Sequence, residues 1–175
     1  MIDEKINQKY LKKIKLLQKY NKHYYNLNKP LIDDFKFDEL KSMVDNTFSD
    51  SDLAAPFASG SNYFDSLVII PCSISTLNKI ASGISDSLIT RMAQVALKER
   101  RKLIIALRET PLDAITLENA LKLSRAGAIV APISPGVYMG ESSMKDMENT
   151  FSEKILSLIG VHPKKGWRTE KIKDE

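Results

Sequence analysis

Residues 102–113, KLIIALRETPLD, decide the fold class of this chain. The stretch is apolar from Leu103 to Leu107 and then reaches Arg108, Glu109 and a Thr-Pro pair. A strand that is buried on both faces of a parallel sheet has such an unbroken apolar run. In open α/β sheets the ligand binds just beyond the carboxyl ends of the strands. Arg108 and Glu109 are therefore candidates for residues that face a ligand.

The sequence around this strand alternates between strand-like and helix-like patterns. SLVIIPCS (66–73) predicts a strand that ends at Pro71, and AIVAP (128–132) predicts a third strand. Helical patterns, bounded by Ser or Asp caps and by glycines, cover 74–82, 87–101, 113–125 and 143–159. Strands that alternate with helices in this way predict an α/β fold with a parallel sheet and right-handed crossovers.

The N-terminal region has a different character. Residues 4–22 repeat apolar positions at helical spacing between lysines, which predicts an amphipathic helix. A second short helix is expected to end near Met43, and the polar residues 45–52 predict a linker. We therefore divide the chain into a helical segment (1–48), an α/β domain (49–168) and a charged tail (169–175).

Composition excludes several classes of protein. The chain has 175 residues, of which 43% are hydrophobic, enough for one core. A single cysteine, Cys72, excludes an internal disulfide framework, and we expect a cytoplasmic protein with neither signal peptide nor membrane span. The net charge of +4 comes from the two ends of the chain, so we expect no nucleic-acid partner.

The end of the first predicted strand resembles an anion-binding site. A helix that opens on Ser73, Ile74, Ser75 and Thr76 offers free backbone N–H groups, hydroxyls and the positive end of its dipole. It is not a P-loop, because it has neither a glycine-rich run nor a Gly-Lys-Ser/Thr sequence. The alternative is that Ser73 serves only as a helix N-cap.

Other polar residues also have two interpretations. Arg108 and Glu109 either form a structural ion pair, or the arginine binds an anion while the carboxylate moves a proton. Lys98 falls near a helix C-terminus, where cations are favoured in any case. Cys72 reads as a packed core thiol, and the two histidines give no metal-site spacing.

Four runs together resemble the flavin prenyltransferases of the UbiX type. They are DLAAPFASGS, VIIPCSISTL, SDSLITRMAQVALKERRKLIIALRETPL and LENALKLSRAGAIVAPISPGVY, within residues 50–168. The resemblance implies a three-layer, Rossmann- or flavodoxin-like flavoprotein that forms homo-oligomers. It implies that FMN contacts Ser73, Ile74, Ser75, Thr76 and Arg108.

The resemblance also implies a reaction. The dimethylallyl group of dimethylallyl phosphate would be transferred to N5 and then C6 of reduced FMN, without a metal, to supply UbiD-type decarboxylases. Glu109 would handle the proton. Lys98, Tyr138 and Lys154 would hold the prenyl phosphate. Arg91 would contribute to this site across a subunit boundary.

The chain departs from this family at several positions. Ser75 stands where a lysine is usual, Met139-Gly140-Glu141 replaces His-Arg-Pro, and Lys154 replaces an arginine. The family's first strand and Gly-Ala-Ser-Gly loop have no recognisable counterpart, so we expect an N-terminally truncated domain. A non-catalytic FMN-binding or assembly module is therefore the alternative to an active enzyme.

Residues 10–44 resemble a different family, the NAD-dependent DNA ligases, at their extreme N-terminal segment. The matching positions are Tyr24, Asp34 and Asp38, with Phe37 where a tyrosine is usual. In those ligases the segment helps hold the nicotinamide mononucleotide half of NAD. The nucleophile motif KxDG is absent, so no ligase activity is expected and a ligase fragment is the third hypothesis.

Overall fold

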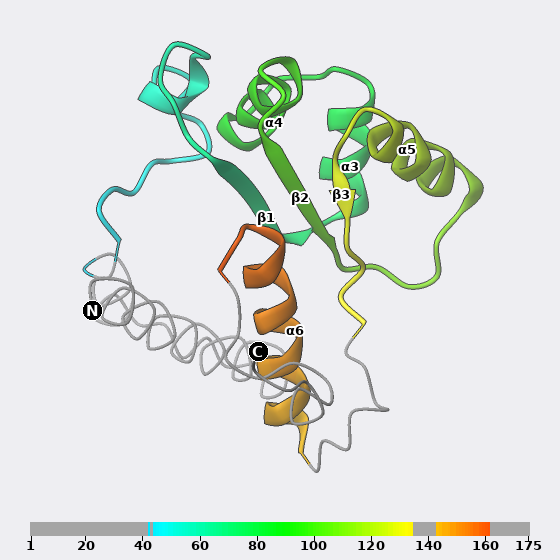
Figure 1. Cartoon of the computed structure of the whole chain (residues 1–175). Helices are drawn as coiled ribbons and strands as arrows, with labels where there is room; N and C mark the ends of the chain where they lie inside the picture. Colours follow the sequence, from blue (N-terminus) through cyan, green and yellow to red (C-terminus); the bar gives the residue numbers. More distant parts are fainter. Residues whose placement is uncertain (1–41, 43, 135–142, 162–175) are drawn as a thin grey trace, which may run out of the picture. The chain divides into compact units, whose positions relative to one another are not determined.

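The computed structural model describes residues 42, 44–134 and 143–161 (Figure 1). The predicted N-terminal helices and the charged tail lie outside the described residues. The chain divides into two compact units, one of residues 48–134 and one that combines 1–47 with 135–175. Each unit is described by itself.

The 48–134 unit is built on a three-stranded parallel sheet. Its strands are β1 (Ser66–Cys72), β2 (Lys102–Leu107) and β3 (Ile129–Val130), in the order β1-β2-β3. The predicted α/β fold with a parallel sheet is thus confirmed. The strand β3 is shorter than the predicted 128–132, although the N–H of Ala131 still donates to the Ile105 carbonyl at 2.9 Å.

Three helices connect these strands: α3 (Ile74–Ala81), α4 (Leu88–Lys98) and α5 (Ala114–Arg125). Each helix has an N-cap residue whose side chain accepts a backbone N–H of the first turn. The N-cap residues are Ser73, Ser87 and Asp113, in that order. Helix α4 ends three residues before the predicted Arg101, because Arg100 adopts a left-handed φ of 56°. The N–H of Arg101 then closes the helix on the Ala96 carbonyl at 2.8 Å.

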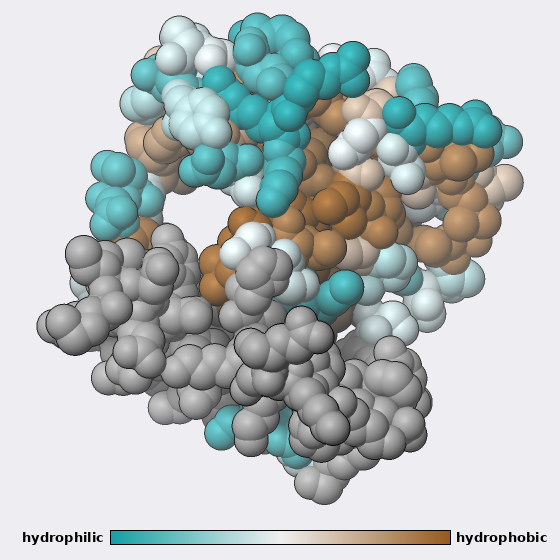
Figure 2. Space-filling model, in the orientation of Figure 1, coloured by the Kyte–Doolittle hydropathy of each residue, from teal (hydrophilic) through white to brown (hydrophobic). Residues whose placement is uncertain are grey.

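The core lies between the sheet and these helices. Leu103, Ile105 and Leu107 are alternate residues of β2. They pack with Ile69 of β1 and with side chains of all three helices. The intervening Ile104 and Ala106 are also fully buried. The central strand is therefore buried on both faces, as a three-layer α/β fold requires. In Figure 2 hydrophobic residues gather over the sheet of this unit.

The other unit contributes one described helix, α6 (Met144–Leu158), close to the predicted 143–159. Ser143 caps it by accepting the N–H of Asp146 at 3.2 Å. Ile155 and Leu156 are its buried residues. Within 44–134 and 143–161, no helix combines the length and the apolar character that a membrane crossing needs.

Candidate functional site

Three strand ends meet at the carboxyl edge of the sheet. The N–H of Arg108 donates to the Cys72 carbonyl at 2.9 Å, which joins the ends of β2 and β1. The N–H of Ile133 donates to the Leu107 carbonyl at 2.8 Å, which joins the segment after β3 to the end of β2. The three strand ends therefore lie together at this edge, as the predicted parallel sheet requires.

An irregularity in β1 shapes this edge. Ile69 pairs with Ile105 and Cys72 pairs with Leu107, so β1 uses one residue more than β2 over the same length. Pro71 lies within this bulge and has no N–H to donate to a ladder. Bulges bend a strand and re-aim the residues that follow it. The bulge thus helps set the direction in which the chain enters α3 at Ser73.

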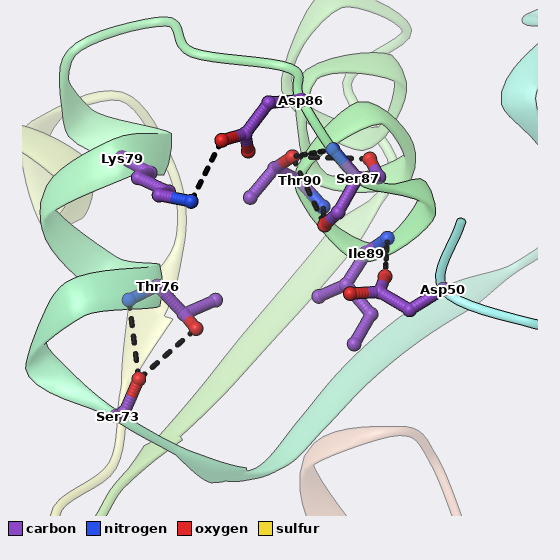
Figure 3. A network of polar contacts seen from close by, with 8 residues as sticks. All are labelled: Asp50, Ser73, Thr76, Lys79, Asp86, Ser87, Ile89 and Thr90. Carbon is purple, nitrogen blue, oxygen red and sulfur yellow. Dashed lines mark hydrogen bonds and ion pairs between the residues drawn. The ribbon is translucent and has the colours of Figure 1, made fainter. Parts of the chain in front are cut away.

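Ser73 is the N-cap of α3. Its Oγ accepts the N–H of Thr76 at 3.2 Å and lies 3.1 Å from Thr76 Oγ1 (Figure 3). The capping interpretation is confirmed, but it does not remove the anion site. The first-turn amides of Ile74 and Ser75 have no acceptor within the helix. They remain at the positive end of the helix dipole, beside the end of β2.

Arg108 and Glu109 follow β2 directly at this edge. The Arg108 side chain is exposed, and that of Glu109 is half-buried. Glu109 Oε1 accepts the N–H of Thr110 at 3.2 Å. The ion pairs in which both partners are described residues are Lys79–Asp86 (2.7 Å) and Lys98–Glu99 (3.1 Å). The alternative of a structural Arg108–Glu109 ion pair is therefore not observed.

Cys72 lies directly beneath this edge and is 1% exposed. Its thiol donates to the Ser73 carbonyl, with Sγ and O 3.4 Å apart. Burial raises the pKa of the Cys72 thiol to about 11. A thiol that stays protonated is a poor nucleophile. The interpretation of Cys72 as a packed core residue is confirmed.

Arg91 and Lys98 both lie on α4. Lys98 precedes the first residue of β2 by four positions and therefore lies near the amino edge of the sheet. The six residues of β2 span roughly 20 Å. Arg91 Nε donates to the Ala58 carbonyl at 3.0 Å. A single chain thus does not bring Lys98 to Arg108.

The remaining predicted site residues lie elsewhere. Tyr138 is outside the described residues, and Lys154 is an exposed residue of α6 in the other unit. Their predicted role in holding a prenyl phosphate stays a prediction. In the described part of the chain, no cluster of three or more His, Cys, Asp or Glu side chains has the arrangement of a metal site.

A structured segment beside α4 belongs to the run DLAAPFASGS, for which the sequence analysis predicted no site role. A 3-10 turn, η1 (Pro56–Ala58), and the residues after it are fastened to α4 and to Arg101. An open cavity of about 390 Å³ lies next to it, lined by Tyr63, Asp65, Glu99, Arg100, Arg101 and Lys102. In the sequence, the adjacent Arg100 and Arg101 are the signal that could have indicated this cavity.

Comparison with known proteins places this geometry in context. The family model described as Flavoprotein matches residues 5–159. The flavin prenyltransferase UbiX of Thermoplasma acidophilum is 51% identical over 128 residues, which are 73% of this chain and 71% of that protein.

Two solved structures are also similar to this chain. AnUbiX, crystallised in complex with FMN and dimethylallyl pyrophosphate, matches with a TM-score of 0.73 and 30% identity over 93% of each chain. A dodecameric FMN-dependent UbiX-like decarboxylase from Escherichia coli O157:H7 matches with a TM-score of 0.72 and 35% identity, over 75% of this chain and 72% of that one.

The family match begins at residue 5 and thus includes the segment 10–44. The resemblance of that segment to DNA ligases and the expected N-terminal truncation stay predictions.

Proposed function

The chain belongs to the Flavoprotein family, and we propose that it is a flavin prenyltransferase that transfers a dimethylallyl group from dimethylallyl phosphate to reduced FMN. The observation that carries this proposal is the bond between the Arg108 N–H and the Cys72 carbonyl. It sets the start of α3 beside the Arg108-Glu109 pair, at the edge where α/β proteins bind ligands. Two relatives named flavin prenyltransferase UbiX are 51% and 44% identical to this chain.

The carboxyl edge has the groups that FMN needs. The free amides of Ile74 and Ser75 and the Ser75 hydroxyl suit an anionic phosphate, and Arg108 adds a cation. Thr76 and the half-buried Ile74 complete the first turn of α3. When bound, reduced FMN supplies the nucleophilic atoms to which the prenyl group is attached. The residues of this chain bind it, orient it and handle the proton.

Glu109 is the proposed proton carrier. The residue is half-buried, and its carboxylate accepts the N–H of Thr110 at 3.2 Å, directly after Arg108 in the chain. A positioned carboxylate that exchanges a proton with a reacting group contributes typically 10²–10⁴-fold to a rate. The side chains proposed to stabilise the departing phosphate are mostly cations: Arg91, Lys98, Tyr138 and Lys154.

The positions of Arg91 and Lys98 favour a site shared between copies of the chain. Both residues lie on α4, and Lys98 at the end of that helix is roughly a strand length from Arg108 within one chain. We propose that a second copy brings them to the flavin. Exposed apolar side chains suit such an assembly, and they include Ile115, Leu117 and Leu121 of α5. The similar Escherichia coli structure is dodecameric.

The proposed product is prenylated FMN, and its proposed recipient is a UbiD-type decarboxylase. A modified flavin is useful only to a second enzyme that binds it. The alternative function is a non-catalytic FMN-binding or assembly module. It is favoured by Ser75 and Lys154, which replace a lysine and an arginine, because Lys154 has lost the bidentate fork of the arginine.

Mass analysis of the flavin separates these functions. Protein is incubated without oxygen with reduced FMN and either dimethylallyl phosphate or the pyrophosphate. An enzyme adds one prenyl unit to the flavin with at least one of the two donors. A module binds FMN and leaves its mass unchanged. A protein that neither binds nor modifies FMN would contradict both functions.

A further inference from the structure

Arg101 fastens the loop 59–63 to the C-terminal end of α4. Its guanidinium donates to the Gly60 carbonyl at 2.7 Å and to the Asn62 carbonyl at 2.8 Å. The same guanidinium lies 4.6 Å from the ring centroid of Phe64 and 5.3 Å from that of Tyr63. An arginine that spans two carbonyls and stacks on aromatic rings uses the features that a lysine lacks.

The loop is also held from its other side. Arg91 Nε donates to the Ala58 carbonyl at 3.0 Å, and Asn62 Nδ2 donates to the Pro56 carbonyl at 2.8 Å. Six hydrogen-bonded or stacked contacts of this kind are more than a solvated helix end requires. The backbone around Gly60 is therefore fixed relative to α4.

Gly60 lies against the Lys98–Glu99 ion pair. A Cβ at this position would lie 3.2 Å from Lys98 Nζ and 3.1 Å from Glu99 Cδ, and it would overlap Glu99 Oε1. The ion pair itself is surface-accessible, with 64% of the Lys98 side chain and 37% of the Glu99 side chain exposed. An exposed ion pair by itself restricts two long side chains only weakly. Contact with a fixed loop restricts them further.

We propose that Arg101 is a positioning residue for Lys98. By fixing the loop through Gly60, it restricts the Lys98 ammonium and its counter-ion Glu99 to one side of α4. A prenyl phosphate that meets a restricted ammonium loses less side-chain entropy on binding. This inference rests on the proposed function, because it assigns Lys98 to the phosphate of the substrate.

The first test replaces Arg101. Arg101→Met removes both carbonyl contacts, and Arg101→Lys keeps the positive charge while losing the planar fork. We expect each variant to raise KM for dimethylallyl phosphate roughly tenfold, because a mutation away from the reacting atoms can still misplace a group that binds the substrate. The dissociation constant of FMN should stay unchanged. Arg125→Met, an exposed charge loss at the end of α5, should leave KM unchanged.

Gly60→Ala tests the same contact without touching Arg101. The new Cβ displaces the Glu99 carboxylate from Lys98, and the backbone of Gly60 does not need a left-handed conformation. KM should rise again, with little change in Tm. This variant decides the question if Arg101→Met fails to fold.

A double-mutant cycle excludes a merely structural role. Once Lys98→Met has removed the ammonium, Arg101→Met should have little further effect on KM. Additive effects, or an unchanged KM in both Arg101→Met and Gly60→Ala, would overturn the inference. A wild-type protein that forms no prenylated flavin would instead overturn the proposed function. In that case calorimetric titration of dimethylallyl phosphate into the FMN-loaded variants still tests whether Arg101 affects phosphate binding, and equal affinities would overturn the inference.

Discussion

Glu109 differs from its neighbour Arg108 in burial. Glu109 is half-buried and its carboxylate accepts the backbone N–H of Thr110, and Arg108 is exposed. A glutamine at position 109 would keep an acceptor oxygen for that N–H and nearly the same shape. The substitution therefore changes the ability to carry a proton and little else.

Glu109→Gln should leave Tm and FMN affinity close to those of the wild type. Prenyl transfer should fall roughly 10²-fold or more, because the positioned proton carrier is lost. Single-turnover assays with pre-bound reduced FMN measure this step. Glu118→Gln, at an exposed position of α5, is the matched control. Unimpaired single turnover in Glu109→Gln would remove Glu109 from the mechanism.

Cys72 should be inert in the folded protein. Burial raises the pKa of its thiol to about 11, so the reactive thiolate is scarce at neutral pH and increases only as the pH approaches that value. A disulfide reagent should modify native protein very slowly at pH 7.5 and unfolded protein at once. Rapid modification of the native protein at that pH would contradict the packing described here.

At the scale of the elements, α3 combines a structural and a binding role at one residue. Ser73 Oγ caps the helix, and the neighbouring amides face the proposed phosphate. Ser73→Ala loses the cap, whereas glycine is itself tolerated at N-cap positions. The two substitutions therefore separate the roles of the hydroxyl.

Ser73→Ala should lower the free energy of unfolding by about 1 kcal/mol, and Ser73→Gly by only a few tenths of that. If the hydroxyl also contacts FMN, both variants should weaken FMN binding to the same extent. Denaturant unfolding and flavin fluorescence titration measure the two quantities. If Ser73→Ala bound FMN much more weakly than Ser73→Gly, FMN affinity would follow stability. Ser73 would then act only as a helix cap.

The sequence was sufficient to predict the elements whose signals are local. Apolar runs identified β1 and β2, and the Ser and Asp caps located the starts of α3, α4 and α5 within a residue. The early end of α4 depends on the backbone conformation of Arg100, for which an arginine gives no signal. The short β3 depends on its pairing with β2.

The candidate site was predictable only in part, because some of its contacts have no local sequence signal. Adjacent strand ends follow from parallel topology, so Ser73, Arg108 and Glu109 could be grouped in advance. The hydrogen bonds of Arg101 connect residues about forty positions apart, and neither partner has a distinctive sequence pattern. Such contacts appear only once the chain has folded.

At the scale of the whole molecule, a shared site makes a prediction about mixed oligomers. Arg108→Ala and Lys98→Met should each be impaired alone, because one alters the flavin edge and the other the donated cation. Mixed oligomers of the two variants, co-expressed and purified together, should recover a fraction of wild-type prenyl transfer. In some of their sites, Arg108 comes from the Lys98→Met chain and Lys98 from the Arg108→Ala chain. No recovery in oligomers shown to contain both variants would contradict a shared site.

The most direct test of the account is a titration of FMN, because its central claim is that the carboxyl edge of the sheet binds the flavin. Flavin fluorescence is followed for the wild type, for Arg108→Ala and for the control Arg125→Ala. The account predicts saturable binding of one FMN per chain, unchanged in Arg125→Ala and at least roughly tenfold weaker in Arg108→Ala, because a charged contact to the ligand is lost. Equal FMN affinity in all three proteins, or no binding by the folded wild type, would contradict it.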